Sequence, residues 1–267
     1  KFNLSKNYDS CFKFFYNTEF NDSNWNDIQV PGHIQLQGFD NPHYTDVTYP
    51  WDGHDVVKPG QIDMGKNKVY QYRKTFDCPQ DFIGNKLILS FEGAESNIYV
   101  WLNGKFIGYA EDSFTPSRFD ITKYTQEKDN VLCVRIFQKC TGTWLEDQDM
   151  WRFTGLFRDV MIYKQPSLHI QDLKIDTDID LDTQKSVLSC VCKMSSNESH
   201  TLQAKLYDPQ GNIVWNGNMQ DSFEIPVENT CLWSSEFPNL YQLELVLYDT
   251  NNEIIETIQE QVGFRKF

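Results

Sequence analysis

The chain of 267 residues contains no run of about 20 apolar residues, the length that a membrane-spanning helix needs. It also contains no Cys-x-x-Cys pair and no Cys/His spacing of the kind that binds structural zinc. Basic residues are few, because 24 Lys and Arg stand against 38 Asp and Glu, a formal net charge of −14. The electrostatic field of this negative charge would repel a polyanion. We therefore expect neither a membrane nor a nucleic acid as a partner.

Disulfide bonds are not expected either. The chain holds seven cysteines, an odd number. Cys190 and Cys192 lie two apart in an apolar run, where a strand would point both side chains to one face. We expect them to be small residues of a hydrophobic core. Reduced cysteines favour a cytoplasmic location, and a periplasmic one stays open if a signal peptide was removed.

Common catalytic motifs are absent as well. There is no Gly-x-Ser-x-Gly elbow, no glycine-rich phosphate loop and no His-Glu-x-x-His pair. Three histidines, His33, His43 and His54, fall close together near Asp52 and Asp55. Their spacings match no helix or hairpin ligand pattern, so we expect no metal site there.

Long segments of helical period are also missing, and apolar residues alternate with period two along most of the chain. This pattern predicts an all-β protein. The strand of residues 98–102 should turn at Asn103-Gly104, because this dipeptide tolerates the positive φ angles of a type I′ turn. Residues 105–109 should then form the hairpin partner. Aromatic residues, 15% of the chain, suit broad sheets with large rings between two layers.

The length indicates two domains, each able to bury its own core. Around Pro166 the aromatic density falls and a new series of strands begins, so we place the boundary there. Residues 1–165 are typical of a jelly-roll β-sandwich. Residues 166–267 carry about seven short strands, which fits an immunoglobulin-like β-sandwich.

The segment of residues 144–160 is the most unusual part of the sequence and reads WLEDQDMWRFTGLFRDV. Folding alone does not require so dense a mixture of carboxylates, arginines and aromatic rings. One interpretation is an ordinary loop in which two arginines neutralise three carboxylates, namely Arg152 and Arg158 against Glu146, Asp147 and Asp149. The other interpretation is a functional segment.

As a whole, this segment resembles the corresponding part of the large bacterial β-galactosidases of glycoside hydrolase family 2. Further motifs carry the same resemblance in the same order along the chain: VPGHIQ at 30–35, YTDVTYPW at 44–51, GYAEDS at 108–113, PSRFDI at 116–121, LWSSEFPNLY at 232–241 and VGFR at 262–265. Together they span the chain from about residue 30 to its end, which is far more than one short pattern matched by chance.

The resemblance implies a galactose-binding-like jelly roll followed by an immunoglobulin-like domain. In the family, two glutamates of a following (β/α)₈ barrel hydrolyse the glycosidic bond with retention. A barrel needs about 250 more residues, so we expect this chain to be an N-terminal fragment without the catalytic pair. The resemblance also implies magnesium in the missing catalytic domain and a homo-oligomer when the protein is full length. Its substrate would be a galactoside, and its own C-terminal barrel would be its partner.

Asp112 is the first candidate site residue. The resemblance implies that it binds a monovalent cation, sodium or potassium, and lies beside the galactose 6-hydroxyl. A carboxylate suits this role, since hard oxygen ligands suit such cations and an ionised acid accepts hydrogen bonds from a hydroxyl. The alternative from the residues alone is an aspartate that opens a turn before Pro116.

Asp46 is the second candidate, and it departs from the family pattern, because it aligns with an asparagine that contacts the sugar. A carboxylate cannot donate a hydrogen bond, and its charge would raise the pKa of the catalytic glutamates unless it is offset. Nearby Val47, Tyr49 and Trp51 could form an apolar wall for the sugar, or simply pack. The carboxylates and arginine of residues 146–152 should build the loop that meets the barrel.

Two hypotheses follow. The first is the N-terminal, sugar-binding portion of a β-galactosidase that hydrolyses terminal β-galactosides such as lactose. The second, from another class, is a stand-alone carbohydrate-binding or adhesion module made of two β-sandwiches. Within the family, β-glucuronidase and β-mannosidase stay possible, although the YTDVTYPW and EDQDMW strings look more like the galactosidases.

Overall fold

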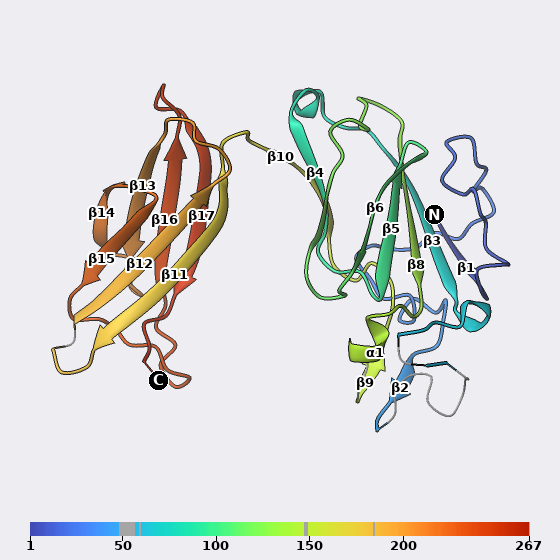
Figure 1. Ribbon diagram of the computed structural model, residues 1–267, viewed down its shortest axis with the longest axis horizontal. Coiled ribbons are helices and arrows are strands. Elements are labelled where there is room, and N and C mark those ends of the chain that lie inside the picture. Colours follow the sequence, from blue (N-terminus) through green and yellow to red (C-terminus); the bar gives the residue numbers. More distant parts are fainter. Residues whose placement is uncertain (48–56, 59, 147–148, 184, 267) are drawn as a thin grey trace. The chain divides into compact units, whose positions relative to one another are not determined.

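The computed structural model describes residues 1–47, 57–58, 60–146, 149–183 and 185–266. The chain divides into two compact units, Lys1–Gln165 and Pro166–Phe267 (Figure 1). Strands dominate both units, which confirms the predicted all-β class. No helix within the described residues is long and apolar enough to cross a membrane.

Unit 1 is a sandwich of two antiparallel sheets. The larger sheet has five strands in the order β1 (Phe2–Ser5), β3 (Val69–Phe76), β8 (Asn130–Phe137), β5 (Asn97–Leu102) and β6 (Lys105–Glu111). The smaller sheet has the order β10 (Val160–Gln165), β4 (Lys86–Phe91) and β7 (Ser117–Asp120). Short elements complete the unit: 3-10 turns at η1 (Met64–Lys66) and η2 (Gln80–Phe82), the helix α1 (Thr143–Glu146), and the pair β2 (His43–Thr45) and β9 (Met150–Arg152).

The turn between β5 and β6 forms at Asn103-Gly104, as the sequence predicts. Both residues have positive φ, 50° and 78°, and Leu102 pairs with Lys105 across the turn. The Asn103 side chain also accepts a hydrogen bond from the Val131 backbone N–H at 2.8 Å. The turn residue therefore connects the hairpin to β8 as well as closing it.

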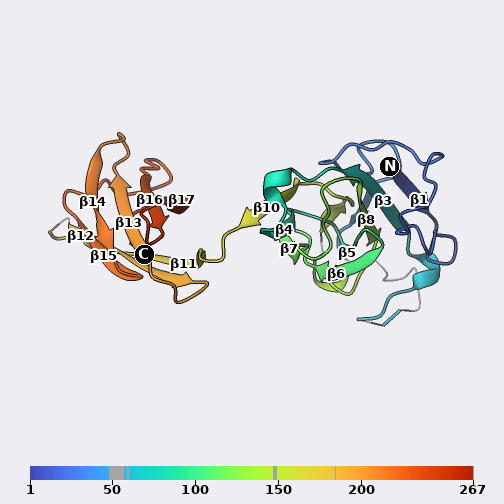
Figure 2. The same cartoon turned by 90° about the horizontal axis from the view of Figure 1, so that it is seen from above.

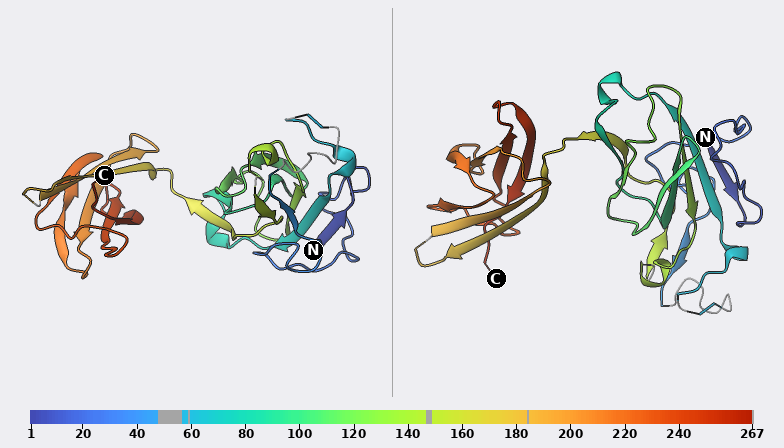
Figure 3. Two further views of the ribbon diagram at one scale, coloured as in Figure 1. Left: turned by 90° about the horizontal axis from the view of Figure 1, so that it is seen from below. Right: turned by 45° about the horizontal axis from the view of Figure 1, so that its top comes forward.

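Over its described residues, 166–183 and 185–266, unit 2 is a second sandwich, with seven strands. One sheet has the order β11 (Ile170–Asp180), β12 (Lys185–Met194) and β15 (Ser222–Val227), and the other has β14 (Ile213–Met219), β13 (Thr201–Tyr207), β16 (Tyr241–Tyr248) and β17 (Ile254–Val262). Figure 2 shows unit 2 from above. Figure 3 shows the yellow β11–β12 pair as a layer apart from the red strands β16 and β17. The strand number fits the expected immunoglobulin-like sandwich.

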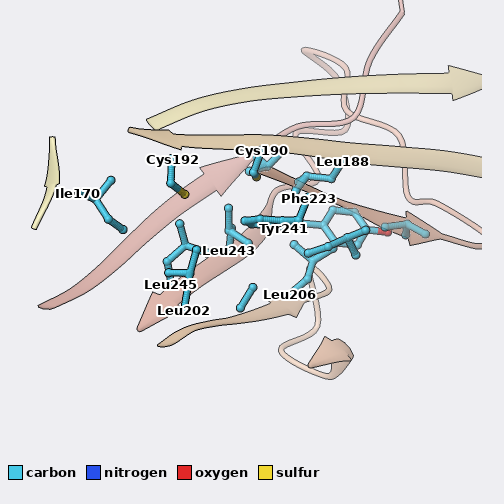
Figure 4. Packing of buried hydrophobic residues seen from close by; sticks show 14 of the residues in the cluster. Ile170, Leu188, Cys190, Cys192, Leu202, Leu206, Phe223, Tyr241, Leu243 and Leu245 are labelled. Atoms are coloured by element: carbon cyan, nitrogen blue, oxygen red, sulfur yellow. The ribbon is translucent and has the colours of Figure 1, made fainter. Parts of the chain in front are cut away.

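The core of unit 2 lies between these two sheets, and Cys190 and Cys192 point into it (Figure 4). Both cysteines are buried, with 1% and 4% exposure, and both are free thiols. The prediction that they are small core residues is confirmed. Burial raises the pKa of the Cys190 thiol to about 12, so this group stays protonated and behaves as an apolar side chain.

Leu243 of β16 is fully buried in the same core, at 0% exposure. We predict that Leu243→Ala lowers the free energy of unfolding by about 2–5 kcal/mol, because the substitution leaves a cavity that the sheets cannot close. Urea unfolding followed by tryptophan fluorescence and circular dichroism measures the change. The control is Ile254→Ala on β17, where the side chain is 63% exposed and the expected loss is below about 0.5 kcal/mol.

Candidate functional site

The candidate site lies at one end of unit 1, where α1, β2 and β9 gather (Figure 1). The strand β6 delivers Asp112 to this end, and β8 leads into the turn before α1. The pair β2–β9 adds Asp46, which directly follows β2. Both candidate residues from the sequence therefore belong to loops at the same end of one sandwich.

The Asp112 carboxylate organises its own loop. Its Oδ1 accepts hydrogen bonds from the backbone N–H groups of Phe114 at 3.2 Å and Thr115 at 3.3 Å, and its Oδ2 accepts one from the Thr115 hydroxyl. These bonds, the hydroxyl first, lower the pKa of Asp112 below its usual value. Asp112 has φ +86° and is exposed. It thus opens a turn before Pro116, and it also presents an ionised carboxylate to solvent.

The two neighbours of Asp112 fasten this loop to the turn before α1 and to α1 itself. The Glu111 carboxylate accepts hydrogen bonds from the Gly142 backbone N–H at 3.1 Å and from the Thr141 hydroxyl at 2.6 Å. On the other side, the buried Ser113 hydroxyl donates to Glu146 Oε2 at 3.0 Å. The three residues of the Glu-Asp-Ser motif therefore have different roles. Its outer members hold the loop, and only the middle carboxylate is directed outward.

Asp46 lies beside an exposed aromatic pair on β2 and β9. Tyr44 and Trp151 are opposite each other in the pair, with ring centroids 5.3 Å apart and exposures of 47% and 59%. The Tyr44 hydroxyl donates to Asp149 Oδ1 at 2.7 Å. That hydrogen bond chiefly raises the pKa of Tyr44, and the charge of the exposed Asp46 adds to the effect. Asp46 is therefore close enough to act electrostatically on this ring.

The apolar wall proposed beside Asp46 is described only in part. Val47 is 83% exposed. Tyr49 and Trp51 lie outside the described residues, as do His54, Asp52, Asp55 and Asp147. Of the other histidines, His33 stacks on Phe157 at 5.3 Å, and His43 belongs to β2. Within the described ranges, no three His, Cys, Asp or Glu residues are placed to hold a metal ion.

The two arginines of residues 144–160 do not act as simple surface counter-ions. Arg152 is buried at 4% exposure and donates to the Gln138 carbonyl at 3.2 Å. Arg158 donates to the carbonyl of Phe114 at 2.7 Å, and so supports the Asp112 loop. Arg158 therefore supports the loop that carries Asp112, whereas Arg152 links β9 to the segment that follows β8.

Glu95 lies beneath the site and was not anticipated from the sequence. It is 8% exposed, and its backbone pairs with Gly155 through hydrogen bonds of 3.1 and 3.0 Å. Burial raises the pKa of Glu95 to about 7, the nearby charge of Glu146 raises it further, and Arg152 opposes the rise. A carboxyl group that titrates near neutrality thus lies close enough to Glu146 of α1 and Arg152 of β9 to respond to their charges.

The raised pKa of Glu95 predicts a pH-dependent stability. The folded protein holds the proton up to about pH 7, whereas an unfolded glutamate loses it near its ordinary pKa of 4.5. The free energy of unfolding should therefore decline as the pH rises from about 4.5 to 7. We predict that Glu95→Gln removes this part of the decline and stabilises the protein at pH 8 by about 1–3 kcal/mol.

Urea unfolding at a series of pH values, compared between Glu95→Gln and the parent, tests this prediction. The exposed Glu127→Gln serves as the matched control, since it makes the same chemical change at the surface. If Glu95→Gln and the parent keep a constant difference from pH 4.5 to 8, the titration of Glu95 is not linked to folding.

Comparison with known proteins agrees with the motifs of this end of unit 1. Residues 2–166 match the family described as "Glycosyl hydrolases family 2, sugar binding domain", and residues 168–265 match "Glycosyl hydrolases family 2". The chain is 43% identical over 274 residues to a beta-galactosidase of Halalkalibacterium halodurans, covering all of this chain and 27% of that protein. It is 39% identical over 268 residues to the beta-galactosidase large subunit of Leuconostoc lactis, covering 94% of this chain and 43% of that protein.

Solved structures share the fold at lower identity. Bacteroides uniformis beta-glucuronidase 2 superposes with a TM-score of 0.74 at 21% identity, over 99% of this chain and 32% of that chain. A beta-glycosidase from Bacteroides vulgatus superposes with a TM-score of 0.73 at 21% identity, over 99% of this chain and 33% of that chain. The chain spans about a quarter of the length of the H. halodurans relative. Because both of its halves match the family's own domains, the chain belongs to glycosyl hydrolase family 2.

Proposed function

We propose that this chain is the N-terminal, non-catalytic portion of a retaining β-galactosidase and that it supplies one edge of the sugar subsite. The single observation that carries the proposal is the geometry of Asp112. Its carboxylate is ionised, exposed and fixed by its own turn, while Glu111 and Ser113 fasten that turn to the segment around α1. The galactosidase names of the most similar relatives support the substrate class.

The chemistry that this chain contributes is binding and orientation. An ionised carboxylate can only accept hydrogen bonds, so Asp112 would receive a proton donor such as a primary hydroxyl of the sugar. Holding that hydroxyl fixes one end of the ring relative to the catalytic groups, which lowers the entropy cost of reaching the transition state. The two glutamates that break and form the glycosidic bond would come from the catalytic barrel.

The ligand atoms at this edge suit a sodium or potassium ion. Asp112 offers hard oxygen atoms, its pKa is lowered, and its carboxylate is directed to solvent. When bound, such an ion would supply positive charge beside the sugar. Asp112 is the residue of this chain that would hold it, and further ligands would come from the substrate, water or the barrel.

An exposed apolar surface supports the idea that this end meets another part of the protein. Five large apolar side chains of β2, α1 and β9 and the residues next to them are exposed: Tyr44, Val47, Leu145, Met150 and Trp151. Leu145 is the extreme case, at 88% exposure. An apolar group of this size on one end of a domain commonly marks an interface. We assign it to contact with the catalytic barrel.

Asp46 would form the second contact with the sugar, and the substitution Asp46→Asn tests it in the full-length enzyme. We expect Asp46→Asn to keep substantial activity and to shift the acid limb of the pH–rate profile to lower pH, because one negative charge near the catalytic pair is lost. The measurement is kcat/KM for a nitrophenyl β-galactoside as a function of pH. A profile superimposable on that of the parent would show that Asp46 is remote from the catalytic pair or already neutralised.

A stand-alone carbohydrate-binding module is the second candidate, and the exposed pair Tyr44–Trp151 favours it, because sugar faces stack on such rings. The two functions predict different affinities of the isolated chain for sugars. A complete module binds galactose or lactose without a partner, whereas one edge of a subsite binds them very weakly. Calorimetric titration of residues 1–267 with both sugars, together with the reading frame downstream of residue 267, distinguishes them.

A further inference from the structure

Two buried arginines lie on the outer face of the five-stranded sheet. Arg73 of β3 and Arg135 of β8 are both 6% exposed, and segments near the N-terminus cover them. Arg73 is neutralised there. Its Nε donates to Asp22 Oδ2 at 2.9 Å in a salt bridge, and its Nη1 donates to the Asn17 carbonyl at 3.0 Å. Arg73 therefore shows how this face accommodates a guanidinium group.

Arg135 has no such neutralising partner. Its Nη2 donates to the carbonyls of Phe12 and Lys13, each at 3.2 Å. Its guanidinium carbon lies over the rings of Phe15 at 5.0 Å and Trp101 at 5.3 Å. Its buried Nε has no hydrogen-bond partner, and no carboxylate forms a salt bridge with it among the residues that the structure places. A buried charge in this state is unfavourable unless an anion approaches it.

A cavity of about 250 Å³ opens beside this guanidinium. Four aromatic and two basic residues are among those that line it: Tyr8, Tyr99, Tyr109, Phe137, Arg135 and Lys139. The Tyr109 hydroxyl donates to Glu111, and within the described residues Glu111 forms no salt bridge with Arg135. Neither Asp46 nor Asp112 lines this cavity, so it is separate from the candidate sugar edge.

We propose that this cavity is a binding site for a small organic anion, with a carboxylate or phosphate group directed at Arg135 and a ring body against the aromatic residues of the lining. The guanidinium recognises either group by charge-assisted hydrogen bonds, and Lys139 is a second basic residue of the lining. The faces of Tyr8, Tyr99 and Tyr109 suit the apolar side of a sugar or aromatic ring. The volume admits one ring but not an oligosaccharide. The ligand class is therefore an acidic monosaccharide, a sugar phosphate or an aromatic acid.

Calorimetric titration of purified residues 1–267 tests the proposal with four probes: galacturonate, galactose 6-phosphate, inorganic phosphate and, as the neutral comparison, galactose. We expect saturable binding of at least one anion with a stoichiometry of one and no measurable binding of galactose. Binding of galacturonate alone identifies the carboxylate as the recognised group. Binding of galactose 6-phosphate and inorganic phosphate identifies the phosphate.

Two variants and one matched control locate the site. Arg135→Gln should abolish anion binding. Because Arg135 also bonds two carbonyls, this variant could unfold, so Lys139→Met provides the independent test and should weaken binding by about fivefold or more, the effect of losing about 1 kcal/mol. Lys86→Met makes the same charge change at the start of β4, in the other sheet, and should leave binding unchanged.

Three results would overturn the proposal. The first is no saturable binding of any anion at millimolar concentration. The second is binding of galactose as tight as that of galacturonate, since recognition would then not involve the charge. The third is equal weakening by Lys139→Met and Lys86→Met, because the anion would then only respond to the overall charge of the protein.

Discussion

In the full-length enzyme, Asp112→Ala is expected to lower kcat/KM for a nitrophenyl β-galactoside by about 10- to 100-fold and to abolish activation by sodium or potassium. The size follows from the loss of one hydrogen bond to a charged group, about 1.5–3 kcal/mol. The carboxylate is exposed, so its removal leaves no buried group without a partner. Steady-state kinetics with and without each cation, in a buffer of constant ionic strength, measure both effects.

The chain offers a matched control for the loss of the turn. Asp120 accepts hydrogen bonds from the backbone N–H of Thr122 at 3.0 Å and from its hydroxyl at 2.6 Å, and these bonds lower its pKa as those of Asp112 do. Asp120→Ala therefore removes a comparable turn carboxylate outside the site. An equal loss of activity in both variants, or an unchanged cation response in Asp112→Ala, would remove Asp112 from the sugar edge.

Local signals in the sequence predict much of the fold. The Asn103-Gly104 turn forms because its two residues adopt positive φ. Cys190 and Cys192 of β12 both face the core because side chains two residues apart in a strand point to the same face. Strands with one buried and one solvent-exposed face show this alternation in their sequence. The series of short strands in unit 2 is of that kind, which explains why its sandwich could be anticipated.

Other strands are not visible in the alternation. In β3, the residues from Val69 to Arg73 are all buried, because its outer face is covered by the N-terminal segments and Arg73 is neutralised there by Asp22. A strand with polar residues buried on one face shows no contrast between its faces. In β15, Pro226 argues against a strand. It is tolerated because β15 is an edge strand, whose one ladder among the described strands is with β12.

The candidate site likewise has features that the sequence predicts and features that it does not. The position of Asp112 could be inferred from its motif, and its turn from Pro116. The hydrogen bonds by which Glu111 and Ser113 hold this loop could not be inferred from the sequence. Their partners lie on the segment around α1, some 30 residues away in the chain. Glu95 gave no signal at all, because its pKa is raised by burial and by the charge of Glu146, against the opposing charge of Arg152, which is a purely tertiary environment.

Residues 1–267, purified alone, are expected to fold and unfold cooperatively but to show no hydrolysis of a nitrophenyl β-galactoside above background. Each unit has its own buried core, so neither needs a further domain for stability. Retaining hydrolysis needs an acid and a nucleophile about 5–5.5 Å apart on either side of the bond. Thermal unfolding and an overnight assay at high protein concentration test the two halves of this expectation.

Three carboxylates near the sugar edge are committed to structural contacts, and we expect none of them to replace the catalytic pair. Glu111 is bound by Thr141 and Gly142, Glu146 by Ser113, and Asp149 by Tyr44. Reproducible turnover by the pure chain that is lost in Glu146→Gln or Asp149→Asn would contradict this assignment and would place the chemistry in residues 144–160. Turnover that survives both substitutions would call for the same test at the exposed Asp46 and Asp112, because hydrolysis at this edge needs a carboxyl group to protonate the leaving oxygen.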